Sequence, residues 1–221
     1  MNLSAWTPHV HFMKNKYTVI SFASKEPAIY ADCAERLAAS CARFSIQCDV
    51  QIVDFSGAHR RDIVLHKPTY ILDALNRHKS PVLWLDCDSD IETVLHDELP
   101  PGDWDVGFAP NPFLNWRLKL GGLLRRNKRP EHRNPVTGFA SAFRYTQSAI
   151  KFLENWKYLC DWPDFAPGGD HIRMSWARQT VSLRECNLAS FLNRKVIINS
   201  GRRKESIARW SVWACYRSIA R

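Results

Sequence analysis

The stretch Pro81-Val82-Leu83-Trp84-Leu85-Asp86-Cys87-Asp88-Ser89-Asp90 decides how the rest of the chain is interpreted. It begins as a short apolar run and ends in three acids at alternate positions. An apolar run that stops abruptly at polar groups is typical of a buried central strand whose carboxyl end reaches a site. The sequence therefore predicts a strand over 81–85 and a cluster of carboxylates directly after it.

Strand-like and helix-like segments alternate on both sides of this stretch. Runs of β-branched and aromatic residues predict strands at 17–23, 48–55, 104–109, 136–143 and 195–199. Apolar residues spaced by three and four predict helices at 28–44, 68–77 and 146–160. Because strands and helices alternate, we expect one α/β domain with a mainly parallel central sheet flanked by helices.

Composition limits the class of protein and its location. A chain of 221 residues that is 45% hydrophobic suits one folded domain and excludes a disordered protein. Its net charge of +9 indicates an anionic partner, which could be nucleic acid, a phosphorylated substrate or an acidic membrane surface. Seven cysteines without C-x-x-C spacing, together with a first segment that does not resemble a secretion signal, favour the cytoplasm.

The acids after the apolar run suit a divalent metal ion. Carboxylate oxygens are the ligands that Mg²⁺ and Mn²⁺ prefer, and alternate side chains of an extended strand point to one side. We therefore expect Asp86, Asp88 and Asp90 to share a face. An EF-hand loop is excluded, because Ile91 and Asp97 stand where that loop needs glycine and glutamate. A haloacid-dehalogenase-like phosphatase with Asp86 as nucleophile, and a simple solvated turn, remain alternatives.

Over residues 17–200 the chain resembles GT-A glycosyltransferases of the bacterial surface-polysaccharide type. The resemblance rests on the opening strand at 17–23, the helix start Lys67-Pro68, and the stretch Trp84-Leu85-Asp86-Cys87-Asp88, which is similar to the family's "LDxD" metal motif. It implies a single GT-A-like (Rossmann-like) domain. It also implies transfer of a hexose-like sugar from a nucleoside diphosphate, with UDP favoured, to a hydroxyl of a glycan, lipid-linked glycan or lipopolysaccharide-type acceptor.

The same resemblance implies roles for individual residues. Asp88 would bind Mn²⁺ or Mg²⁺ directly, and Asp86 would contact the metal or the ribose of the donor. The nucleotide pocket would be lined by Ser21, Phe22 and Ala23. Lys67 would lie near the donor phosphates, which also fits the attraction of a helix start for anions. A surface lysine before a helix remains the alternative for Lys67.

A second group of candidate residues is Pro167-Gly168-Gly169-Asp170-His171. The glycines allow a ligand to approach closely, and the acid and the imidazole can handle a proton or a metal ion. The family resemblance implies that Asp170 removes the proton of the acceptor hydroxyl and that His171 is a further metal ligand. The alternative is that Asp170 caps the start of a helix.

Two basic segments remain outside these motifs. Residues 117–133 hold seven Lys and Arg side chains against one acid, and either clamp an anionic acceptor or form a solvated loop. Residues 205–221 combine aromatic and arginine side chains, which predicts a basic aromatic amphipathic helix beyond a domain at 1–204. Such a tail either packs on the domain or binds an anionic membrane surface, peripherally at the inner face.

Two other functions compete with sugar transfer. The basic segment and nine tryptophans would suit a nucleic-acid-binding module, but the carboxylates repel phosphates unless a metal intervenes, so a nucleic-acid partner is disfavoured. A sugar-1-phosphate nucleotidyltransferase would need a glycine-rich loop containing arginine after the first strand. Ser24-Lys25-Glu26 stands there instead, so this function ranks below transfer.

Overall fold

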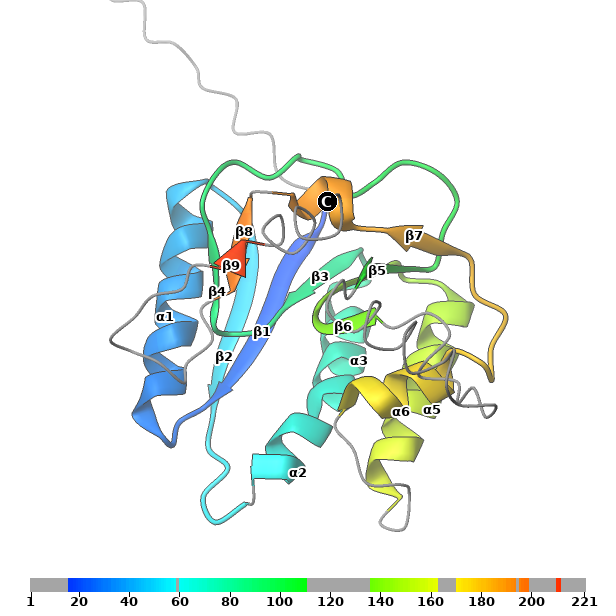
Figure 1. The fold of residues 1–221 in the computed structure, drawn as a ribbon, viewed down its shortest axis with the longest axis horizontal. Coiled ribbons are helices and arrows are strands. Elements are labelled where there is room, and N and C mark those ends of the chain that lie inside the picture. The colour runs from blue at the N-terminus through cyan, green and yellow to red at the C-terminus, as the bar shows by residue number, and fades with distance from the viewer. Residues whose placement is uncertain are drawn as a thin grey trace, which may run out of the picture.

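The computed structural model describes residues 16–58, 60–110, 136–162, 170–193, 195–198 and 210–211. A six-stranded sheet in the order β2-β1-β3-β6-β5-β7 lies at the centre, with helices on both faces (Figure 1). Its strands are β1 (Thr18–Ser24), β2 (Cys48–Val53), β3 (Val82–Leu85), β5 (Val106–Pro110), β6 (Val136–Phe143) and β7 (Glu185–Asn187). The prediction of a single mixed α/β domain is confirmed.

Strand direction agrees with the mainly parallel prediction, with one exception. β1 pairs in parallel with β2 and β3, and β5 pairs in parallel with β7. β6 is antiparallel to both of its neighbours, β3 and β5. It enters the sheet between two strands that precede it in the sequence, and this insertion was not predicted.

Helices cover both faces of the sheet, and three of them were predicted from apolar periodicity. The main ones are α1 (Ala28–Arg43), α3 (Lys67–His78), α5 (Gln147–Asp161) and α6 (Asp170–Ala177), with short α2 (Arg60–Leu65) and α7 (Ala189–Leu192). The hydroxyl of Thr146 accepts a hydrogen bond from the Ala149 backbone N–H at 3.2 Å, which caps the start of α5. The predicted helices 28–44, 68–77 and 146–160 therefore agree with the structure to within a residue.

The sheet is buried on both faces, because alternate strand residues enter two separate cores. Phe22 and Trp84 pack with α3 and α5 in one core. Val19 and Leu83, on neighbouring strands of the same sheet, pack with α1 and α7 in the other. A strand that is covered on both sides must be apolar throughout, which explains the continuous run at 82–85.

The chain turns immediately after the central apolar strand. The Ser89 N–H donates to the Asp86 carbonyl at 2.9 Å, and β4 (Ser89–Ile91) then joins a separate three-stranded sheet with β8 (Val196–Ile198) and β9 (Trp210–Ser211). The expectation that Asp86, Asp88 and Asp90 lie along one extended strand is therefore wrong. A hydrogen-bonded turn separates Asp86 from β4.

The expected C-terminal helix is not present at the two tail residues that the structure describes. Trp210–Ser211 form β9, antiparallel to β8. The other residues of 205–221, and the basic segment 117–133, lie outside the described residues. Among the described helices, none has the length and apolar composition to cross a membrane.

Candidate functional site

A cavity of about 540 Å³ opens at the carboxyl ends of β1 and β3. That volume lies within the range of roughly 300–1,000 Å³ that small-molecule sites occupy. The cavity is lined by Phe22, Ala23, Ser24, Glu26, Pro27, Tyr30, Ala58, Ile63, Val64, Lys67, Trp84, Asp86, Cys87, Asp88 and Asp170. The two groups of acids that the sequence singled out, after the central strand and near residue 170, therefore meet in one cavity.

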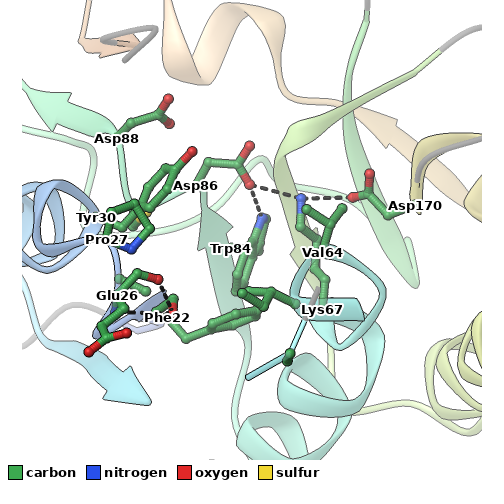
Figure 2. Close-up of a pocket in the computed structure, with 15 residues that line it drawn as sticks. Phe22, Glu26, Pro27, Tyr30, Val64, Lys67, Trp84, Asp86, Asp88 and Asp170 are labelled. Carbon is green, nitrogen blue, oxygen red and sulfur yellow. Dashed lines mark hydrogen bonds and ion pairs between the residues drawn. The ribbon is translucent and has the colours of Figure 1, made fainter. Parts of the chain in front are cut away.

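Lys67 joins the two groups of acids (Figure 2). Its ammonium donates hydrogen bonds to Asp86 Oδ1 at 2.9 Å and to the Gly138 carbonyl at 3.0 Å. Asp170 Oδ2 lies 2.8 Å from the same nitrogen, at ion-pair distance but without the alignment of a hydrogen bond. Three protein oxygens therefore lie within 3.0 Å of this ammonium, and two of its three N–H groups donate to them.

Burial and charge act in opposite directions on this ion pair. The Lys67 side chain is 9% exposed and that of Asp170 is 10% exposed. Burial alone would lower the pKa of Lys67, but the carboxylates of Asp170 and Asp86 raise it above its usual value. Burial alone would raise the pKa of Asp170, but Lys67 and His171 hold it well below its usual range. Both partners are therefore charged at neutral pH.

Asp88 lies in a different electrostatic environment. Burial, and then the negative charge of Asp86, raise the pKa of its carboxyl to about 7. Figure 2 shows Asp86 between Asp88 and the Lys67 ammonium, so the lysine is nearer to Asp86. A buried carboxylate beside a second one is stabilised by a cation. The pair offers hard oxygen ligands, and Mg²⁺ is commonly held by one or two carboxylates plus substrate phosphates, so these residues fit a divalent ion.

The other predicted site residues are divided between the cavity and its surroundings. Phe22 and Ala23 line the cavity, whereas Ser21 is fully buried and is not among the lining residues. The His171 side chain is 44% exposed, and its Nδ1 lies 3.9 Å from Asp170 Oδ1. Within the described part of the chain, no three His, Cys, Asp or Glu side chains group as metal ligands, so His171 does not join Asp86 and Asp88.

Three residues of the site were not identified from the sequence. Trp84 donates its indole N–H to Asp86 Oδ1 at 3.0 Å, and Tyr30 lines the cavity from α1. Gly138 leaves room for the ion pair, because a Cβ there would lie 2.9 Å from Asp170 Oδ2. Two signals were present: Trp84 stands two residues before Asp86 and so shares its face of the strand, and a glycine inside a strand often marks a close approach.

Comparisons with known proteins place the fold. No protein-family model and no curated protein sequence matches the chain. Among solved structures, it is similar to a glycosyltransferase involved in glycosylation of the major capsid of PBCV-1, with 9% identity, a TM-score of 0.56, and coverage of 92% of this chain and 98% of that one.

Two further structures match less closely. One is mouse xyloside xylosyltransferase 1, with a TM-score of 0.42, 12% identity and coverage of 74% of this chain and 82% of that one. The other is a Drosophila β-1,4-galactosyltransferase 7 mutant in complex with manganese, UDP-Gal and xylobiose, with a TM-score of 0.40, 11% identity and coverage of 77% and 64%. The likeness to the PBCV-1 enzyme over nearly the whole of both chains shows that this protein shares the fold of that enzyme.

Proposed function

We propose that the protein is a metal-dependent glycosyltransferase that moves a hexose-like sugar from a nucleoside-diphosphate donor to a hydroxyl acceptor. One observation carries the proposal: Asp86 and Asp88 lie together in the wall of a cavity of about 540 Å³ at the carboxyl ends of parallel strands. Ligands of open α/β sheets bind in such a position. The glycosyltransferase fold supports the same conclusion.

The donor lies along the side of the cavity formed by β1 and α1. Phe22 and Tyr30 offer aromatic surface to the nucleoside there. Asp86 and Asp88 would hold Mn²⁺ or Mg²⁺, which would supply positive charge for the diphosphate of the donor. Lys67 contributes through Asp86 and Asp170, because its ammonium already pairs with both carboxylates in the cavity wall. UDP is the nucleotide that we expect.

The acceptor approaches from the side of Asp170. Its hydroxyl oxygen bonds to the anomeric carbon of the sugar while the bond from that carbon to the diphosphate oxygen breaks. The hydroxyl proton passes to the Asp170 carboxylate, and the nucleoside diphosphate leaves with the electrons of the broken bond. The ion pair with Lys67 keeps Asp170 ionised but also lowers its basicity, so the assignment of Asp170 as the base rests on its place in the cavity wall.

The acceptor class and the cellular site are further parts of the proposal. We assign the acceptor to a glycan or lipid-linked glycan of the lipopolysaccharide type, and the protein to the cytoplasm, peripherally at an anionic membrane surface. The net charge of +9 supports an anionic acceptor or surface. The basic segment 117–133 and most of the tail, which would make these contacts, lie outside the described residues.

A donor screen tests the proposed function. The protein is incubated with UDP-, GDP- and TDP-sugars, and release of nucleoside diphosphate is followed with Mn²⁺ or with EDTA. We expect hydrolysis of one UDP-hexose that needs the metal. Calorimetry that finds no binding of any nucleoside diphosphate in Mn²⁺ would contradict the proposal. Hydrolysis of a simple phosphomonoester that is lost in Asp86→Asn would favour the phosphatase alternative instead.

A further inference from the structure

We propose that Trp84 is a positioning residue, whose indole N–H fixes the carboxylate of Asp86 so that one oxygen is held by the protein and the other is offered to the cavity. This inference rests on the proposed function, because it assigns Asp86 to the donor side of that site. The inference adds a residue outside the pair of acids Asp86 and Asp88. Trp84 stands before these acids, inside the apolar strand β3.

The indole N–H and the lysine ammonium share the same two acceptors. Trp84 Nε1 lies 3.0 Å from Asp86 Oδ1 and 3.2 Å from the Gly138 carbonyl. Lys67 Nζ lies 2.9 Å and 3.0 Å from these same two oxygens. Asp86 Oδ1 therefore receives two donors, one from β3 and one from α3. A carboxylate oxygen that is held from two directions cannot rotate without losing a hydrogen bond.

The indole is itself fixed by packing. Trp84 is 2% exposed, and its ring lies 5.6 Å from that of Phe22 and 6.0 Å from that of Tyr70. The Lys67 ammonium lies 5.2 Å from the Trp84 ring, a cation–π contact on the side of the ion pair. A buried ring with neighbours on several sides has one orientation. Its N–H therefore points at Asp86 whether or not a ligand is present.

The second carboxylate oxygen of Asp86 is directed differently. Figure 2 shows it on the opposite side of the carboxylate from the contacts to Trp84 and Lys67. The Asp86 side chain is 34% exposed and lines the cavity. Fixing a ligand before binding removes the cost of ordering it at the moment of binding. Without the indole, only the Lys67 ammonium would hold Asp86 Oδ1.

The first experiment tests the hydrogen bond from the Trp84 indole to Asp86 without any substrate. In protein labelled with ¹⁵N-tryptophan, the indole resonance of Trp84 is assigned by its loss in Trp84→Phe. We expect this resonance to move in Asp86→Ala while the Trp104 indole, which donates to the Pro100 carbonyl at 2.7 Å, stays in place. A Trp84 resonance that does not move in Asp86→Ala overturns the proposal.

The second experiment measures the effect on binding with a matched control. Trp84→Phe removes the N–H and replaces the indole with a smaller aromatic ring, and Trp104→Phe makes the same change at another tryptophan that is 2% exposed. Mn²⁺ is titrated by electron paramagnetic resonance, and UDP is titrated in its presence. We expect Trp84→Phe to weaken Mn²⁺ binding by roughly 10–100-fold, as loss of a group that orients a metal ligand does, and Trp104→Phe to leave it near wild type.

The outcomes separate this inference from the proposed function. Trp84→Phe that binds Mn²⁺ as tightly as wild type overturns the positioning role, even if sugar transfer is established. Wild-type protein that binds Mn²⁺ but no nucleotide contradicts the proposed function, and the comparison of the two variants on Mn²⁺ alone still decides the role of Trp84. Wild-type protein that binds no Mn²⁺ overturns both.

Discussion

Lys67 lies between two groups of acids: Asp86 and Asp88 on the turn after β3, and Asp170 at the start of α6. The two groups differ in how their negative charge is balanced. Asp170 has its own cation at 2.8 Å, within the fold. Asp88 has a second carboxylate as its neighbour, and its pKa is raised to about 7. One acid is thus neutralised by the chain itself, and the other would be neutralised by a bound cation. The first suits a fixed catalytic geometry, and the second suits capture of a cation.

The largest effect is expected on the side that depends on a bound cation. Asp88→Ala should abolish Mn²⁺-dependent UDP binding, because the ion loses one of its two carboxylate ligands. Without the ion, the negative charge of Asp86 repels the diphosphate. Calorimetry with Mn²⁺ and with EDTA measures this. Asp90→Ala is the matched control, since Asp90 belongs to the same segment but does not line the cavity. Equal UDP affinity in Asp88→Ala and wild type would contradict the assignment of Asp88 to cation-dependent donor binding.

Loss of the negative charge of Asp170 should reduce sugar transfer and leave UDP binding intact. Asp170→Asn keeps the size of the side chain and removes its basicity, so we expect transfer to fall by roughly 10²–10⁴-fold, the contribution of a positioned general base. UDP affinity in Mn²⁺ should stay near wild type. Both are measured by steady-state kinetics and calorimetry on the same sample. If this variant loses UDP as fully as Asp88→Ala does, Asp170 belongs to the donor side.

The ion pair itself should matter most for stability. Lys67→Met leaves Asp86 and Asp170 without their shared cation, and removing one partner of a buried pair costs about 3–5 kcal/mol. Urea unfolding measures the loss, with Lys16→Met as control because the Lys16–Glu98 pair is exposed and should be dispensable. The double variant Lys67→Met, Asp170→Leu should recover part of the loss. A single variant as stable as wild type would show that the pair is not buried in solution.

The smallest effect concerns an ion pair that serves the fold alone. Hydrogen bonds from Arg184 lower the pKa of Asp105 to about 2, and Arg184 Nη2 lies 2.8 Å from Asp105 Oδ1. Because the folded-state pKa is depressed, this stability is present above the usual aspartate value and is lost as pH falls toward 2. Asp105→Asn should be less stable than wild type at pH 6 and should lose less between pH 4 and pH 2. Parallel pH profiles in urea unfolding would contradict this assignment.

Elements that depend on local pattern were predictable, and elements that depend on distant pairing were not. The apolar run at 82–85 and the spacing within 28–44 and 146–160 fixed three elements nearly to the residue. The direction of β6 was not predictable, because it depends on pairing with β3, whose paired residues stand 55 to 61 positions earlier, from Leu85↔Ala140 to Val82↔Phe143. Apolar alternation along a strand is the same whichever way its neighbours run.

The candidate site shows the same division. Asp86 and Asp88 were found because they follow a buried strand, where a site is expected on general grounds. The pairing of Lys67 with Asp170 joins α3 to α6, and no spacing in the sequence encodes it. Trp84 was assigned to the core, which is correct for its ring. The hydrogen bond from its N–H to Asp86 was not predicted, because the sequence does not show which acceptor a buried donor contacts.

The place of β6 in the sheet has a consequence for the growing chain. β3 is complete at Leu85, but the strand that covers its open edge is made only when Val136–Phe143 emerges from the ribosome. At roughly 5–20 residues per second, the wait for these about 50 residues lasts on the order of several seconds. For that time an apolar edge remains open to other nascent chains. Synthesis of this protein should therefore depend on chaperones that shield nascent strands.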